Sequence, residues 1–489
     1  MNLSINAIDS LIVLAYLLAV LAFGLWIGRG QRNTADYFLG GRSLPWWALL
    51  LSIVATETST VTFLSVPSMS WAPAHGDLRF LQITFGYIVG RLVVAQVLLP
   101  LYFHGAPFTA YEVLQSRFGN ATRRIASLLF LVTRNLSDAL RLYLTALVLQ
   151  TVLGLDMITC VVVLGIITII YTLVGGVKSV IWNDCVQFII YMLGAAAAGV
   201  ILVRSLPGGW EQGLQFAREN HKLHLLDFDF SLVKPTMTFW AGLIGGMFLT
   251  MATHGTDQLM VQRYLSARSQ RDAGLALVCS GLIVCLQFVM FLLIGVGLAC
   301  YYAIYPPPTP FTQGDKVFAH FIVHNMPTGL TGLTLAAVFA AAMSTLSSSL
   351  NSSASALVTD LYLPLRRVEL SPADQLRVSR LATVLFGVLQ MAIAVGSGEI
   401  GATESTVMRV LAIAGFATGP VLGLYWLAVF TRRVQQTSAL SGFGIGLAIL
   451  TSVAFGTRLS WPWYAVVGSL ATLLAGWLVQ KVVDARASV

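Results

Sequence analysis

The sequence has few charged residues, few cysteines and no enzyme signature. Asp, Glu, Lys and Arg make up 10% of its 489 residues, whereas water-soluble domains average about 25%. The five cysteines all fall in apolar segments without metal-ligand spacing, which indicates small core residues. The sequence contains no HExxH motif, no CxxC pair and no Walker phosphate loop. These absences argue against a soluble domain and against an enzyme.

The first residues also lack the features of a cleaved signal peptide. The segment MNLSINAIDS has no positive charge, and the apolar run after it continues to about residue 28 without a small-residue cleavage site. This pattern predicts a retained first membrane span.

Apolar length is what the chain has in abundance. Hydrophobic residues make up 57% of the sequence, the mean hydropathy is +0.79, and a helix needs roughly 20 apolar residues to cross a bilayer. The sequence predicts thirteen such spans: 8–28, 45–70, 80–102, 123–152, 157–174, 177–206, 237–260, 273–304, 329–362, 375–397, 404–429, 437–456 and 461–482. We therefore expect an all-α polytopic protein of the cell (inner) membrane.

The distribution of basic residues predicts the orientation of these spans. The net charge is +8, but the basic residues are scattered in short loops rather than gathered in a patch, which argues against a nucleic-acid partner. With the N-terminus outside, 18 of the 29 Lys and Arg residues fall on the inner side, 8 on the outer side and 3 within spans. The positive-inside rule then predicts an outer N-terminus and an inner C-terminus.

A stripe of hydroxyl residues interrupts the apolar segment 335–362. Ser344, Ser347 and Ser348 stand at helical positions i, i+3 and i+4, and eight of the twelve residues from 344 to 355 are Ser or Thr. In hydrocarbon these hydroxyls need partners, which their own helix, a neighbouring helix or a bound ion can supply. One interpretation is helix packing, and the other is a site for Na⁺ built from neutral oxygens.

Two of the predicted spans contain sequences that can interrupt a helix. Span 45–70 holds TETST (56–60), whose hydroxyls compete for backbone hydrogen bonds. Span 237–260 holds three glycines (Gly242, Gly245, Gly246) before a polar THGTDQ end. Because the two spans lie five apart, the group that the second one opens is inverted relative to the first. This placement is typical of transporters in which a broken helix leads each of two inverted repeats.

Several longer motifs resemble the sodium/solute symporter family, which includes bacterial sialic acid and sodium/glucose cotransporters. The motifs are YTLVGGVKSVIWNDCVQ (171–187), GTDQLMVQRYL (255–265), AAAMSTLSSSLNSSASALVTDLY (340–362), ADYFLGGR (35–42) and GPVLGLYWLAVF (419–430). The resemblance covers nearly the whole chain and implies a leucine-transporter-type fold with two inverted five-helix repeats. The repeats would be 45–206 and 237–429, with a leading helix in 1–30 and two trailing helices in 437–482.

The resemblance also implies ligands for sodium. The first site would use the backbone carbonyls of Ala55, Thr58 and Ala341 and the hydroxyls of Ser344 and Thr345. A second site, which only some relatives have, would combine the Asp184 carboxylate with the hydroxyls of Ser344, Ser347 and Ser348. With both sites, two Na⁺ would move in each cycle. The alternative for Asp184 is an interfacial carboxylate at the inner end of its span, close to Lys178.

The resemblance places the solute beside the break in span 45–70. It implies contacts from Glu57, Ser59 and Thr62, with Gln82 on the next span as a further candidate. Glu57 departs from the family, in which this position often carries a neutral polar residue. A carboxylate at mid-membrane costs roughly 2.5 to 3.5 kcal/mol or more unless it is paired, so Glu57 needs a partner or a function.

Candidate partners for Glu57 form a charged stripe on span 123–152, where Arg134, Asp138 and Arg141 stand at i, i+4 and i+7. One interpretation is an internal ion-pair network with Glu57. In the other, an arginine holds a solute carboxylate, or Glu57 meets a solute amine or hydroxyl. Further expectations concern a structural or snorkelling Arg91, a structural His254, and the candidate cavity-wall aromatics Phe63, Trp71, Tyr87 and Tyr143.

The predicted function is sodium-coupled symport of a small polar organic solute, an organic acid or a sugar-like molecule, by alternating access. The arginines favour an acid, whereas Glu57 favours a neutral sugar or an amino-bearing solute. Sodium is the expected ion, and the solute and the lipid bilayer are the expected partners; the sequence leaves the oligomeric state open. The alternatives are proton coupling through Glu57 and Asp138, or a channel or sodium-responsive sensor of the same fold.

Overall fold

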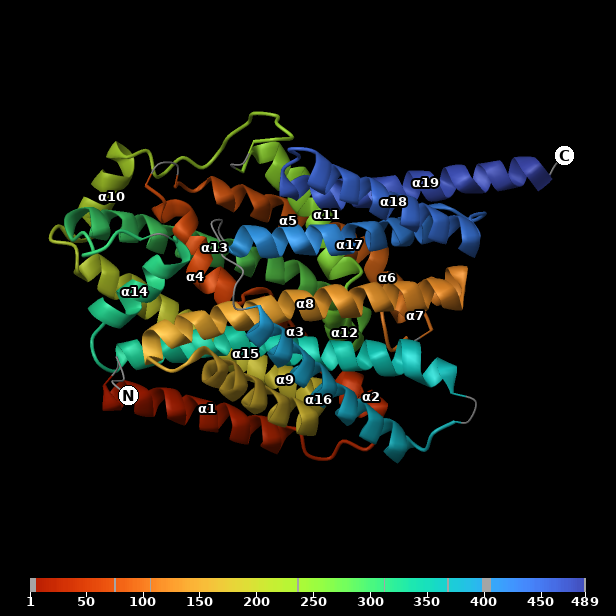
Figure 1. Ribbon diagram of the computed structural model, residues 1–489, viewed down its shortest axis with the longest axis horizontal. Coiled ribbons are helices and arrows are strands. Elements are labelled where there is room, and N and C mark those ends of the chain that lie inside the picture. The colour runs from red at the N-terminus through yellow and green to blue at the C-terminus, as the bar shows by residue number, and fades with distance from the viewer. Residues whose placement is uncertain are drawn as a thin grey trace.

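The protein is a bundle of helices that run largely along its longest axis (Figure 1). The computed structural model describes residues 6–73, 76–105, 107–234, 237–311, 313–366, 369–397 and 406–487. Within these ranges, the one β-type pairing is an isolated bridge between Leu44 and Ala267. The all-α prediction is therefore confirmed for the described part of the chain.

The helices of the first half include a broken pair and a very long helix. They are α1 (Ala7–Ile27), α2 (Thr34–Leu39), α3 (Trp46–Glu57), α4 (Thr60–Trp71), α5 (Ile83–Val93), α6 (Leu99–Phe103), α7 (Tyr111–Phe118), α8 (Asn120–Leu153), α9 (Met157–Arg204) and α10 (Gly209–Glu219). The second half holds α11 (Gly246–Gly255), α12 (Gln258–Leu265), α13 (Gln270–Ile304), α14 (Asp315–Asn325), α15 (Leu330–Ala356), α16 (Pro372–Gly396), α17 (Thr406–Phe430), α18 (Gln436–Gly456) and α19 (Tyr464–Ala487).

Most of the predicted spans correspond to long apolar helices. Among the described residues, nine helical segments are long and apolar enough to cross a membrane, and the bent pair α3 and α4 makes a tenth. One of the nine, α9, contains two predicted spans, and it leaves helical geometry at Gly176 (φ 53°), between them. A Cβ at Gly176 would lie 2.3 Å from the carbonyl oxygen of Tyr37, so both the backbone angle and this close approach require glycine.

The remaining two predicted spans correspond to helices that are charged or interrupted. The 123–152 prediction matches α8, which carries the charged stripe of Arg134, Asp138 and Arg141. The 237–260 prediction matches α11 and the start of α12, which are separated at Thr256 and Asp257. The first two residues of the 404–429 prediction lie outside the described residues.

The glycines of the 237–260 span do not unwind the helix, contrary to our expectation. Residues Ala241–Gly245 form a π-helical turn that continues directly into α11, and the interruption comes later, at Thr256 and Asp257. A Cβ built on Gly86 of α5 would lie 2.3 Å from the carbonyl oxygen of Gly242. The glycines therefore permit close packing of two helices, and the polar end of the segment provides the break.

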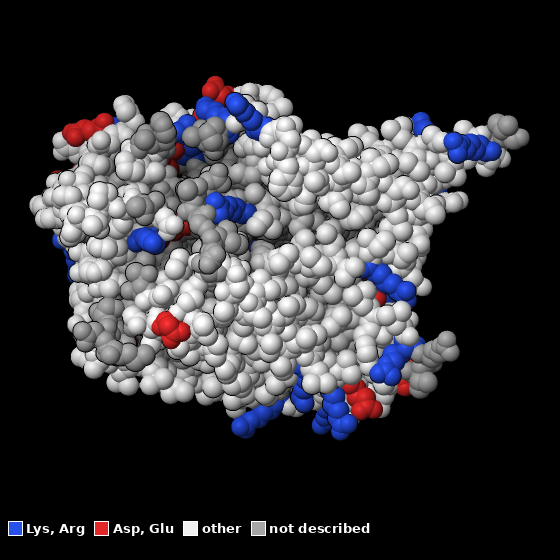
Figure 2. Space-filling model, viewed as in Figure 1, with Lys and Arg blue, Asp and Glu red and all other residues white. Residues whose placement is uncertain are grey.

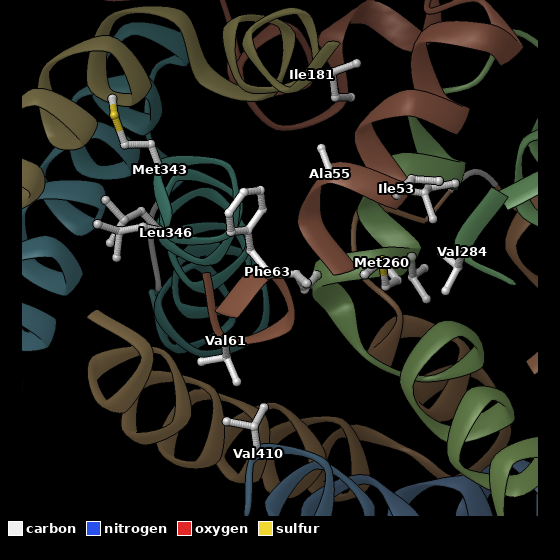
Figure 3. Packing of buried hydrophobic residues seen from close by; sticks show 14 of the residues in the cluster. Ile53, Ala55, Val61, Phe63, Ile181, Met260, Val284, Met343, Leu346 and Val410 are labelled. Atoms are coloured by element: carbon white, nitrogen blue, oxygen red, sulfur yellow. The ribbon is translucent and has the colours of Figure 1, made fainter. Parts of the chain in front are cut away.

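A continuous hydrophobic core surrounds α15. This helix packs along α9 and also contacts α1, α3, α8 and α16. Figure 3 labels Ala55, Val61 and Phe63, from the two halves of the broken pair, which belong to the same core cluster as Met343 and Leu346 of α15. The broken pair is therefore packed against α15, the helix that carries the hydroxyl stripe.

Charged side chains avoid the middle of the visible face of the molecule. Figure 2 shows a broad uncharged area over the centre of the bundle, with most visible Lys, Arg, Asp and Glu near helix ends and loops. The connection between the predicted spans 177–206 and 237–260 contains α10, and the connection between 273–304 and 329–362 contains α14. These two helices lie at the same end of the bundle (Figure 1).

Candidate functional site

The break between α3 and α4 exposes backbone carbonyls at the centre of the bundle. The two helices meet at an angle of 63°, and Thr58 (ψ 85°) and Ser59 (ψ 173°) leave helical geometry between them. The N–H of Ser59 donates to the Glu57 carbonyl instead of to Ala55. Because the helical bond to Ala55 is lost at the break, this carbonyl can accept a hydrogen bond from another element.

The hydroxyl stripe of α15 provides that element. Ser344 Oγ donates to the carbonyl of Ala55 at 2.9 Å, and Thr345 Oγ1 donates to the carbonyl of Thr56 at 3.1 Å. The Ala341 carbonyl also accepts from both hydroxyls, at 3.2 and 3.4 Å. We call this group the neutral oxygen cluster: Ala55, Thr56, Ala341, Ser344 and Thr345. Its buried carbonyl and hydroxyl oxygens carry no net charge and are ligands of the kind that hard cations prefer.

Four of the five residues expected at the first sodium site belong to this cluster, whereas the fifth, Thr58, does not. The second carbonyl that the α15 hydroxyls contact belongs to Thr56. The Thr58 hydroxyl points to α13, where it donates to Gln287 Oε1 at 2.6 Å.

Asp184 of α9 belongs to a second group, which contains an arginine and meets α15 at Ser348, one helical turn from Ser344. Asp184 is fully buried, and its ion-pair partner is Arg263 rather than Lys178. Its Oδ2 atom accepts from Ser52 Oγ at 2.5 Å and pairs with the guanidinium of Arg263 at 3.2 Å. The Arg263 guanidinium also contacts the hydroxyls of Thr56 and Ser348. We call this group the Asp184–Arg263 cluster: Ser52, Thr56, Asp184, Arg263 and Ser348.

The expected second sodium site is only partly assembled. Ser348 contacts Arg263, and Ser344 belongs to the neutral oxygen cluster. Ser347 donates to the carbonyl of Ser344 in its own helix at 3.2 Å. Arg263 was not among the expected site residues: it lies within the GTDQLMVQRYL motif, but beyond the end of the predicted span 237–260.

A cavity of about 110 Å³ lies beside the helix break. It is lined by residues of α3, α5, α7, α8, α11, α12 and α17, and these include four charged side chains, Glu57, Arg134, Arg141 and Asp257, and one histidine, His254. Tyr87 lines the cavity as expected. Two of the other candidate aromatics pack elsewhere: Phe63 lies against Phe291 and Phe318, and Trp71 against Phe311.

Glu57 is paired, but not with the residues that the sequence suggested. Its Oε2 atom forms an ion pair with Arg91 of α5 and lies 3.5 Å from His254 Nε2 of α11. Arg91 and His254 also contact each other at 3.2 Å. The proposed pairing of Glu57 with Arg134 or Arg141 is therefore wrong in this conformation, because the polar groups that contact Glu57 belong to α5 and α11.

Arg134 and Arg141 form a separate charged group on α8. Arg134 pairs with Asp257 and lies 3.6 Å from Asp138, while Arg141 donates to Asp138 at 2.9 Å. Asp257 also accepts from the backbone N–H of Leu259 and so caps α12. Asp257 was not among the expected site residues, although it occupies the polar end of the 237–260 span.

The other expected solute contacts are dispersed. Ser59, Asp138, Arg141 and Thr345 line a small void of about 10 Å³ between the break and α15. Thr62 is buried and lines neither of these spaces. Gln82 is occupied outside both: its amide donates to the carbonyls of Arg79 and Met237, and its oxygen accepts from the N–H of Asp227.

Comparison with known proteins identifies the family to which the chain belongs. A model of the sodium:solute symporter family matches residues 37–446. The chain belongs to this family. It is therefore a sodium-coupled, multi-pass membrane transporter and not an enzyme, as its sequence predicted.

Individual relatives match this symporter over almost its whole length. The sodium/sialic acid symporter SiaT of Proteus mirabilis is 29% identical over 480 residues, which cover 96% of this chain and 94% of SiaT. The human sodium/iodide cotransporter is 30% identical over 463 residues, covering 91% of this chain and 69% of the human protein. The solved structure of a substrate-bound, outward-open, Na⁺-coupled sialic acid symporter superposes with a TM-score of 0.90 at 28% identity, covering 98% of each chain.

Proposed function

We propose that this symporter imports a small organic anion together with Na⁺ by alternating access. Sodium binds at the neutral oxygen cluster, and the solute binds in the cavity beside Glu57. The observation that carries the proposal is that one helix break serves both places: the Thr56 carbonyl belongs to the cluster, while Thr56 and Glu57 line the cavity. An ion that orders the break therefore also orders one wall of the solute site, which is a physical basis for coupling.

Sodium at the neutral oxygen cluster is supported by the character of its oxygens. A cation there would be held by the carbonyls of Ala55, Thr58 and Ala341 and the hydroxyls of Ser344 and Thr345, with Thr56 as an additional carbonyl. The hydroxyl protons, which now point at carbonyls, can rotate away so that the oxygen lone pairs face the ion. Protons would gain little from such a site, because none of these groups titrates in the physiological range.

An anionic solute is supported by the pairing of the cavity's charges. Glu57 is neutralised by Arg91, whose side chain is fully buried, so it has little free charge for a solute amine. By contrast, Arg134 pairs with Asp257 and Arg141 with Asp138, and in each pair the guanidinium side chain is the more exposed: 12% and 18% for the arginines that line the cavity, against 2% and 1% for the carboxylates. Guanidinium groups suit carboxylates because they can donate two parallel hydrogen bonds. Sialic acid and iodide, the solutes of the two relatives, are both anionic.

The finer topology that the sequence predicted is also part of our proposal. We propose thirteen membrane spans, an outer N-terminus and an inner C-terminus. The inverted repeats would begin with the broken pair α3 and α4 and with the segment interrupted between α11 and α12. The domain boundaries proposed from the sequence, 1–30, 45–206, 237–429 and 437–482, fall in or next to connections between helices, except residue 482, which lies within α19.

A thermal-shift screen of the purified protein tests this function. The panel holds N-acetylneuraminate, iodide, short monocarboxylates, neutral sugars and amino acids, each in sodium salt and in matched potassium salt. We expect an anion to raise the melting temperature in sodium and not in potassium. Equal stabilisation in both salts would contradict sodium coupling and favour proton coupling or a channel. A sodium-dependent shift that only neutral or amino-bearing solutes produce would contradict the proposal that the solute is an anion.

A further inference from the structure

The Asp184–Arg263 cluster already contains a cation. The Arg263 guanidinium contacts two residues of the expected second sodium site, Asp184 and Ser348, together with Ser52 and Thr56. Its Nε atom donates to Ser52 at 2.9 Å, and a terminal nitrogen donates to the Leu259 carbonyl at 2.6 Å. Each of its three nitrogens therefore has a protein partner.

The charge of this cluster is balanced without an ion from solution. Asp184 is the carboxylate that pairs with Arg263, and both side chains are almost completely buried, at 0% and 3% exposure. A sodium ion beside Asp184 would add a second positive charge without a second negative one. Repulsion between two cations at such separations is strong in a buried site, because little water is present to screen it.

The oxygens themselves would accept an ion if the guanidinium were absent. Asp184 Oδ1 is buried and accepts no hydrogen bond within the described structure, and Ser52, Thr56 and Ser348 would lose their contacts to Arg263. The set would then hold one carboxylate and several hydroxyl oxygens, which suits a hard cation. Charge, rather than a lack of ligands, is what opposes a second sodium.

We propose that the Arg263 guanidinium takes the place of a second sodium ion, so that this symporter binds a single Na⁺ at the neutral oxygen cluster. The inference rests on the proposed function, because it takes that cluster as the sodium site. It replaces the expectation of two sodium ions, since the residue types of a second site are present but a residue of the chain neutralises its carboxylate.

The test is to count saturable sodium ions bound per molecule of purified full-length protein, with radioactive ²²Na⁺ and without solute. We expect one ion in the wild type. Arg263→Gln should bind two, because Asp184 is then free to hold an ion. Arg263→Lys keeps the positive charge and should bind one, and Asp184→Asn/Arg263→Gln removes both charges and should also bind one.

Two ions in the wild type would overturn the inference while leaving sodium coupling intact, and this measurement does not depend on the folding of any variant. One ion in a folded Arg263→Gln protein would also overturn it. The absence of saturable binding in the wild type would overturn the proposed sodium site and this inference with it. The double variant Ser344→Ala/Thr345→Ala identifies the ion that is counted, since it should reduce the wild-type count to zero.

Discussion

The neutral oxygen cluster and the Asp184–Arg263 cluster are built on the same helices, yet they differ in charge. Both use the end of α3 and the hydroxyl face of α15, and Thr56 belongs to both through its carbonyl and its hydroxyl. The first cluster contains no charged side chain, whereas the second contains a complete ion pair. The two groups lie about one helical turn apart on α15, at residues 344–345 and 348.

The difference teaches which of the two groups can exchange an ion with solution. A buried carboxylate must be neutralised, and here the chain supplies its own cation, which cannot leave. Neutral oxygens need no permanent partner, because their hydroxyls can satisfy the carbonyls when no ion is present. A transport cycle requires an ion that arrives and departs, so the neutral cluster is the one suited to coupling.

If one sodium ion moves per cycle, as we propose, the energetics of uptake follow. At about 100 mV and a tenfold gradient, one Na⁺ supplies about 3.7 kcal/mol, of which a monovalent anion returns about 2.3 kcal/mol. The remaining 1.4 kcal/mol corresponds to roughly tenfold accumulation. One Na⁺ with one monovalent anion would therefore be an electroneutral pair, driven by the sodium gradient alone.

The largest effect is expected when the neutral cluster loses its hydroxyls. Ser344→Ala/Thr345→Ala removes two ligands, each worth about 1.5–3 kcal/mol to a charged partner, so sodium affinity should fall by more than about a hundredfold and sodium-dependent uptake should be lost. Uptake into proteoliposomes and ²²Na⁺ binding measure this. Ser352→Ala is the matched control, because Ser352 is equally buried on α15 but donates only to the carbonyl of Ser349. Unchanged sodium affinity in the folded double variant would remove the basis for the comparison.

The Asp184–Arg263 cluster should instead respond in stability. Asp184→Asn leaves the guanidinium of Arg263 buried without its counter-charge, and we expect a loss of about 3–5 kcal/mol in the free energy of unfolding. Asp184→Asn/Arg263→Gln should recover much of this loss, because neither charge remains. Chemical denaturation in mixed micelles measures both.

Asp374→Asn is the control for this stability effect. Asp374 pairs with Arg377, and these side chains are 48% and 78% exposed, so the change should cost less than about 1 kcal/mol. A cost for Asp184→Asn that is no larger than that of the control would show that the buried pair is not what distinguishes the two clusters.

A substitution in the cavity should change the affinity for the solute but not the affinity for sodium. Arg141→Gln removes one guanidinium from a solute carboxylate, for an expected loss of about 1.5–3 kcal/mol, or roughly tenfold to a hundredfold in the dissociation constant. Sodium affinity measured without solute should stay the same, because Arg141 is not part of either cluster. Arg377→Gln, which removes an exposed arginine, is the control. Equal solute binding by Arg141→Gln and the control would show that this arginine does not hold the solute.

Features that depend on local sequence were predicted well. The break at Thr56–Thr60, the α15 hydroxyl face and the boundary at Gly176 all follow from hydroxyls, glycines and apolar periodicity within one segment. Four of the five residues expected at the first sodium site also lie close together, since they fall on the two segments that these patterns identified.

Pairings between distant helices could not be read from one sequence. Glu57 pairs with Arg91 and His254, and Asp184 pairs with Arg263, because of how α5, α11 and α12 are rotated in the bundle. Nothing in the sequence alone favoured these partners of Glu57 over the charged stripe on α8. The glycines near Gly242 were misread for the same reason: whether a glycine frees the backbone or admits a neighbouring helix depends on what packs against it.

The smallest effect is expected at an ion group outside the membrane-spanning helices, which shows how much of the contrast comes from burial. Asp227 accepts from Lys234 at 2.6 Å, and Arg79 pairs with it at 3.2 Å. Burial would raise the pKa of Asp227, but hydrogen bonds from the Lys234 ammonium, the Asp229 N–H and Arg79 bring this pKa below its ordinary value. Lys234→Gln should cost less than about 1 kcal/mol, since solvent and salt screen the pair.

The pH dependence of this effect has a definite sign. Because the pKa of Asp227 is lowered in the folded state, the stabilisation is present above the ordinary aspartate pKa of about 3.9 and is lost as the pH falls through the folded value. The difference in unfolding free energy between the wild type and Lys234→Gln should therefore shrink below about pH 4, and also in high salt at neutral pH. A difference as large as that of Asp184→Asn, or one that grows on acidification, would mean that burial does not explain why the Asp184–Arg263 pair stabilises the fold more strongly than this partly exposed pair.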